Sequence, residues 1–183
     1  MATIDRIIWE VEKLIQKYKT RDPYELCDAL GIRVRLKDLG TSLKAYYFYQ
    51  SRVRNIVLNE RVSKIVRPVL VGHELGHDRI HPHIAMLKGF KEVELFDMAS
   101  PTEYEANLFD AELLIDDVVL MELLNDDSIA FFGVASELNV PAALLDFKFR
   151  ILRHKGYQIE SPNIANSDFL KNDIGAFEPD IYD

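Results

Sequence analysis

The sequence predicts an α+β fold, in which a small three- to four-stranded sheet packs on one long helix and a helical part follows. Two patterns support the mixed class. Residues 32–37 alternate apolar and basic side chains, and residues 43–58 are rich in aromatic and β-branched side chains, as in strands. Residues 4–18 and 62–70 repeat apolar side chains at helical intervals. This combination of strands and helices predicts the α+β class.

The composition is that of a globular protein and excludes several classes of function. The chain has 183 residues, of which 48% are hydrophobic and 28% charged. It has neither an apolar run long enough to span a membrane nor a secretory signal, so we expect no membrane partner and a cytoplasmic location. A single cysteine, Cys27, fits a reducing compartment, and we expect it to be a small buried side chain.

The first half of the chain is predicted to contain the sheet and three helices. After the helix at residues 4–18, a short helix begins at Asp22 and Pro23, which suit the cap and the first position, and ends at Gly31. A strand at residues 32–37 and a hairpin at 43–58 follow. The next helix is expected to bury Val62 and Ile65, and Pro68 either kinks that helix or marks its true start.

The second half is predicted to be mainly helical. An edge strand is expected around Val93, Leu95 and Phe96, followed by a helix from Ser100 to Leu114. Residues 117–153 are helical again with two breaks, and the acidic segment from residue 158 is expected to be loosely ordered.

The chemically specific feature is the run His73-Glu74-Leu75-Gly76-His77. Two histidines four apart on a helix point the same way, so both imidazoles can bind one Zn²⁺. A glutamate directly after the first histidine can touch a metal-bound water and act as the general base. His73 and His77 also continue the apolar stripe of their helix, which predicts that both are buried. Gly76 indicates the close approach of another element beside the metal.

The third metal ligand has three candidates. Residues two apart on a helix point to opposite sides, so only one of Glu103 and Glu105 can face the zinc. We favour Glu103, because it shares a face with Asn107, which could orient a ligand histidine. Either glutamate could instead cap the helix. His83 has the spacing of an extended zinc motif, but Ile80 stands where that motif needs glycine.

With these motifs in place, the chain resembles the ImmA/IrrE family of metallo-endopeptidases over most of residues 22–156. The similar segments include Ile56-Val57-Leu58-Asn59, the motif at 73–77, Glu103-Tyr104-Glu105-Ala106-Asn107-Leu108-Phe109 and Ala111-Glu112-Leu113-Leu114. The resemblance implies zinc held by His73, His77 and a glutamate of the later helix, with Glu74 as the catalytic acid and base. It also implies a protein substrate, a DNA-binding helix-turn-helix repressor of a phage or mobile element.

These observations predict a zinc metallo-endopeptidase with His73, His77 and Glu103 as ligands and Glu74 as general base. We expect a zincin-like domain over residues 1–116, a helix-turn-helix-like helical extension over 117–157 and an acidic tail over 158–183. The alternative is a zinc-containing regulatory module that inactivates a partner by binding, without cleavage.

Several weaker patterns are expected to reflect packing or solvent exposure rather than chemistry. Lys148, Arg150, Arg153 and Lys155 could meet DNA phosphates, but the net charge of −8 argues against direct nucleic-acid binding. Tyr46, Tyr47 and Tyr49 could stabilise an oxyanion, although packing in the sheet is the expected role. His81 and His83 are expected to be exposed loop histidines.

Overall fold

The computed structural model describes residues 3–87, 89–92, 96, 100–126, 129 and 131–159. The helices are α1 (Thr3–Tyr18), α2 (Pro23–Ala29), α3 (Val66–Ile80), α4 (Pro82–Leu87), α5 (Pro101–Leu114), α6 (Asp117–Leu124), α7 (Phe131–Glu137) and α8 (Ala142–His154). The strands are β1 (Ile32–Lys37), β2 (Ala45–Gln50), β3 (Val53–Asn59) and β4 (Phe90–Glu92).

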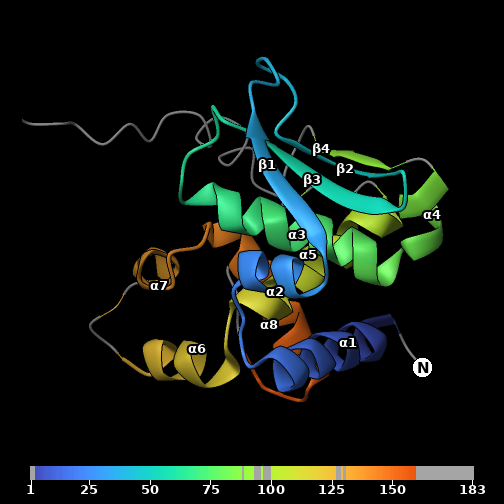
Figure 1. Ribbon diagram of the computed structural model, residues 1–183. Coiled ribbons are helices and arrows are strands. Elements are labelled where there is room, and N and C mark those ends of the chain that lie inside the picture. Colours follow the sequence, from blue (N-terminus) through green and yellow to red (C-terminus); the bar gives the residue numbers. More distant parts are fainter. Residues whose placement is uncertain are drawn as a thin grey trace, which may run out of the picture.

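The strands form a four-stranded mixed sheet in the order β1-β3-β2-β4 (Figure 1). β1 runs parallel to β3, whereas β2 pairs antiparallel with β3 and β4. The register aligns Val34, Ile56 and Tyr47 across the face that packs on α3. The predicted α+β fold and the size of its sheet are confirmed.

The helices lie in layers beneath the sheet. Figure 1 shows α3 directly below the strands, with α5 and α1 further from them. A single hydrophobic core joins these layers and includes Ile7, Leu58, Leu70, Leu108 and Phe147. It therefore extends from α1 to α8, and the boundary expected after residue 116 stays a prediction. None of the described helices is long and apolar enough to cross a membrane.

Helix α2 begins as its sequence predicts. The Asp22 side chain accepts hydrogen bonds from the backbone N–H groups of Tyr24 at 2.7 Å and Glu25 at 3.2 Å. Gly31 follows the helix with φ of +72°, a conformation that glycine adopts without strain.

Two expected boundaries differ in the structure. Helix α3 begins at Val66, so Pro68 lies in its first turn, where its missing N–H has no helical partner to lose. Ile65 is 52% exposed, and the expectation that it faces the core was wrong. The edge strand lies at Phe90–Glu92 rather than around Phe96, which has φ of +67°; Val93 and Leu95 are outside the described residues.

Helices α3 and α5 pack closely because α3 has glycine at two contact positions. A Cβ on Gly76 would lie 3.2 Å from the carbonyl oxygen of Ala106 and 3.3 Å from its Cα. A Cβ on Gly72 would lie 1.9 Å from Oδ1 of Asp110. The close approach expected beside Gly76 is therefore confirmed, and Gly72 provides a second one.

Asp110 is a fully buried acid at this contact. Among the described residues neither of its carboxylate oxygens has a hydrogen-bond partner. Burial raises the pKa of Asp110 well above its ordinary value, although the nearby His73 acts in the opposite direction. The Asp110 carboxylate occupies the space in which a side chain at position 72 would lie.

The C-terminal end of α3 is tied to the sheet and to α1. Asp78 accepts hydrogen bonds from the Tyr47 hydroxyl at 2.7 Å and from Arg54 at 3.0 Å. Arg79 donates to Glu10 of α1 at 2.8 Å. These contacts fix the rotation of α3 about its axis. They also give Tyr47 a packing role, as expected.

Buried ion pairs join α8 to α5 and α6. Lys148 is fully buried, and its Nζ lies 2.6 Å from Glu112 and 2.5 Å from Asp117. Lys155 pairs with the same two acids at 2.6 and 2.7 Å. A lysine enclosed in this way cannot reach a DNA phosphate, so the structure contradicts the DNA-reading alternative for Lys148.

The contact between Gly72 and Asp110 generates a stability prediction. Gly72→Ala should lower the free energy of unfolding by about 1–3 kcal/mol, because the new methyl group overlaps a carboxylate that has no exit to solvent. The same substitution in an Asp110→Ala background should cost clearly less. Urea unfolding of the four proteins of this double-mutant cycle measures the difference.

Gly76→Ala is the matched control, since its Cβ would meet the backbone of Ala106, which Asp110→Ala does not remove. An equal cost of Gly72→Ala in both backgrounds would contradict the assignment of the contact.

Candidate metal centre

Helix α3 brings two imidazoles together inside the protein. His73 and His77 are each 1% exposed, as the apolar stripe predicted. Their Nε2 atoms lie 3.1 Å apart, because side chains four residues apart on a helix project from the same face. The Nε2 atoms of both histidines can therefore bind the same metal ion.

Helix α5 supplies a carboxylate to the same point. Oε2 of Glu103 lies 3.0 Å from Nε2 of His73 and 3.3 Å from Nε2 of His77. The three ligand atoms lie within 4.8 Å of one another. Two imidazoles and one carboxylate form a ligand set found in catalytic zinc sites. These side chains therefore fit a metal ion.

The protonation states suit metal binding. Burial lowers the pKa of His77 to about 4, although the Glu103 carboxylate opposes this effect, so the imidazole is neutral at pH 7. Burial alone would raise the pKa of Glu103, but its close contacts with His73 and His77 hold the pKa well below its ordinary value. Metal binding needs neutral histidine and ionised carboxylate, and His77 and Glu103 meet these conditions at neutral pH.

Asn107 orients the first histidine. Its Oδ1 lies 2.9 Å from Nδ1 of His73, one helical turn along α5 from Glu103. With the amide oxygen as acceptor, Nδ1 carries the proton and Nε2 keeps its lone pair for the metal. This is the role expected of Asn107 from its shared face with Glu103.

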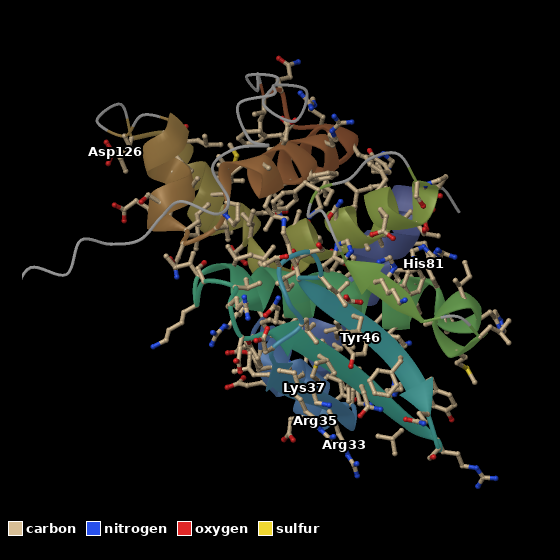
Figure 2. All side chains as sticks on the ribbon, turned by 90° about the horizontal axis from the view of Figure 1, so that it is seen from above. Arg33, Arg35, Lys37, Tyr46, His81 and Asp126 are labelled. Carbon is tan, nitrogen blue, oxygen red and sulfur yellow. The ribbon has the colours of Figure 1, made fainter. Side chains whose placement is uncertain are left out.

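His81 orients the second histidine, and the expectation that it is an exposed loop residue was wrong. It is 9% exposed, and its Nδ1 lies 3.3 Å from Nδ1 of His77 (His81 is labelled in Figure 2). Its Nε2 lies 2.8 Å from Oε2 of Glu105, which in turn pairs with Arg6 at 3.3 Å. Glu105 thus faces His81 rather than the two-histidine site.

This line of contacts sets the tautomer of His77. Glu105 can only accept, so Nε2 of His81 donates to it. Burial lowers the pKa of His81 in spite of the Glu105 carboxylate, which keeps the imidazole neutral and makes its Nδ1 an acceptor. His77 then donates from Nδ1, and its Nε2 remains free for a metal. Phe90 of β4 stacks on the same ring at 3.6 Å between centroids.

The other residues that the sequence suggested for the site differ in position and exposure. Glu74 is fully buried on the same turn as His73. His83 is exposed in α4, outside the cluster of His73, His77 and Glu103. The Ser100 side chain makes no cap bond to the first turn of α5, and the two glutamates contact histidines instead.

Sequence reasoning missed the part played by His81. The signal was present, because His73, His77 and His81 recur at intervals of four and therefore share one face of a helix. The sequence prediction instead placed His81 in an exposed loop. The structure extends α3 to Ile80, with His81 at its C-terminal cap.

A buried histidine pair on one helix and a glutamate from a second helix, beside a small mixed sheet, form a site of the kind found in metal-dependent peptidases. Residues 27–150 match the family model of the IrrE N-terminal-like domain. The chain therefore belongs to the ImmA/IrrE family, a family of metallopeptidases.

Two relatives support this assignment. The Uncharacterized immunity region protein 2 of Bacillus phage phi105 is 38% identical over 133 residues, which cover 70% of this chain and 83% of that protein. The Metallopeptidase ImmA of Bacillus subtilis strain 168 is 28% identical over 161 residues, which cover 85% and 91%.

The geometry predicts which glutamate binds the metal. Glu103→Gln should lower zinc affinity by more than the roughly 10–100-fold that loss of an orienting residue causes, because it removes a charged ligand. Competition with a chromophoric chelator measures the affinity. Full zinc affinity in Glu103→Gln, with loss of zinc in Glu105→Gln, would contradict this arrangement.

His81 gives a graded prediction. His81→Ala and Glu105→Gln should each weaken zinc binding by roughly 10–100-fold, since each leaves His77 without its fixed tautomer. His81→Asn, which can still accept from His77, should lose less. The exposed His83 is the matched control, and His83→Ala should leave the affinity unchanged. An equal loss in both alanine variants would show that His81 does not act through His77.

Proposed function

We propose that this protein is a zinc-dependent endopeptidase in which His73, His77 and Glu103 hold the metal and Glu74 is the general base. The observation that carries the proposal is the convergence of two buried imidazoles and one carboxylate from two helices. Membership of a metallopeptidase family supports the same reaction class. Zinc is the expected metal because it prefers these ligands in tetrahedral sites.

The residues divide the work of peptide hydrolysis. A zinc ion held by His73, His77 and Glu103 would supply a Lewis acid that lowers the pKa of a water molecule towards roughly 7. Glu74 accepts the proton of the attacking water and passes it to the leaving amine. Asn107 and His81 keep both imidazoles in the binding tautomer. Because His73 and His77 are buried, bulk water does not surround their imidazole rings.

The substrate we propose is a DNA-binding repressor of the helix-turn-helix class, from a phage or another mobile element. One relative carries the name of a phage immunity region protein and the other that of Metallopeptidase ImmA. Repressors maintain phage immunity, so a protease from such a region has a repressor as its natural target. A repressor substrate would also place this protein in the cytoplasm, where the DNA lies.

Glu74→Gln tests the enzymatic role. The amide keeps the size of the side chain but cannot take a proton, so the variant should retain zinc and partner binding and lose cleavage by several orders of magnitude. Incubation with a co-expressed repressor, followed by mass spectrometry of the fragments, measures cleavage.

The same variant separates the enzyme from a module that inactivates its partner by binding alone. If the wild type releases the repressor from its operator without producing fragments, and Glu74→Gln does the same, the enzymatic proposal is wrong. His83→Ala serves as a control for unspecific effects of substitution near α3.

A further inference from the structure

The outer face of the sheet, opposite to α3, carries a row of basic side chains. The register pairs Arg33 with Asn55, Arg35 with Val57 and Lys37 with Asn59, so the three cations alternate with Val34 and Leu36 along β1. All three are exposed, and Figure 2 shows them in a row along this edge. Alternate residues of a strand lie roughly 6.6 Å apart, which spaces the charges regularly.

Aromatic side chains continue this face across β2. Tyr46 and Phe48 stack with their ring centroids 5.5 Å apart, and both are half-buried. Tyr46 pairs in register with Val57 on one side and with Lys91 of β4 on the other. The outer face therefore combines a basic edge, an aromatic pair and a further exposed lysine. No described helix covers it (Figure 1).

The cations of this face have no acidic partner within the described residues. Arg33, Arg35, Lys37 and Lys91 form no ion pair with a described acidic side chain, whereas Arg54, Arg79 and Lys148 are each paired. The protein as a whole carries a net charge of −8. The outer face is therefore a local group of four cations whose charge no described acid neutralises, on a chain that is acidic overall.

The chain itself contains a segment of matching chemistry. Residues 160–183, outside the described part, have six acidic residues against one lysine, a net charge of −5. Their aromatic side chains are Phe169, Phe177 and Tyr182. Twenty-four residues can extend to about 80 Å, far enough to reach any face of the molecule from the end of α8.

We propose that residues 160–183 bind the outer face of the sheet, with their carboxylates on the β1 cations and an aromatic side chain against Tyr46 and Phe48. Charge complementarity over several exposed pairs favours the contact, and tethering raises the effective concentration to the millimolar range. The contact is intramolecular and weakens with salt, because exposed charges are screened. This inference is independent of the proposed protease activity.

A spin label on the segment tests the contact in the full-length chain. Cys27 is buried, and burial raises the pKa of its thiol to about 12, so a nitroxide reacts selectively with Ser167→Cys. The amide NMR signals of residues 33–37, Tyr46 and Phe48 should broaden. The broadening should disappear in Arg33→Gln/Arg35→Gln/Lys37→Gln and at high salt.

The matched control removes three exposed cations from other surfaces. In Lys17→Gln/Lys64→Gln/Arg153→Gln the broadening of β1 should persist, since the net charge changes equally but the outer face does not. Equal loss in both triple variants would overturn the proposal in favour of unspecific charge attraction.

Three other results would also overturn it. Broadening that spares β1 would place the segment elsewhere. Broadening that appears only when labelled and unlabelled chains are mixed would assign the face to a second copy. Binding of single-stranded oligo-dT to the β1 cations, without broadening by the label, would assign the face to nucleic acid.

Discussion

Helices α3 and α5 approach each other closely at Gly72 and Gly76, and the candidate metal centre depends on this contact. The backbone of Ala106 lies where larger side chains on α3 would stand. At this separation Glu103, one turn before the contact on α5, reaches both histidines with a single carboxylate oxygen. A wider separation would leave the two imidazoles without their acidic partner. The sheet above and α1 below hold α3 in the required rotation through Asp78 and Arg79.

Polar side chains around the histidine pair determine which ring nitrogen of each imidazole carries the proton. Asn107 accepts from His73, and His81 accepts from His77 while donating to Glu105. Arg6 of α1 forms an ion pair with Glu105 on the solvent side of these contacts. Three helices therefore contribute to one tautomeric state, in which both Nε2 atoms face the site. Since burial keeps the His77 imidazole neutral, this ligand is ready for a cation before one binds.

The sequence was informative where a local pattern has a single physical cause. The four-residue spacing of His73 and His77 determined their common face, and Asp22 and Pro23 determined the start of α2. The shared face of Glu103 and Asn107 correctly placed both near the histidines. Sequence reasoning failed where tertiary contacts decide. His81 was expected to be exposed, but it is buried where it contacts His77 of α3 and Glu105 of α5. The contact between Gly72 and Asp110 could not be predicted either, because it depends on how two helices that are distant in the sequence pack together.

A crystal structure of the zinc-loaded protein, with anomalous diffraction recorded at the zinc edge, would show which side chains bind the metal. We expect one anomalous peak about 2.0–2.2 Å from Nε2 of His73, Nε2 of His77 and a carboxylate oxygen of Glu103. His81 and Glu105 should remain hydrogen-bonded to each other, away from the metal. A peak bound by His81 or Glu105 in place of Glu103 would show that this ligand set is wrong.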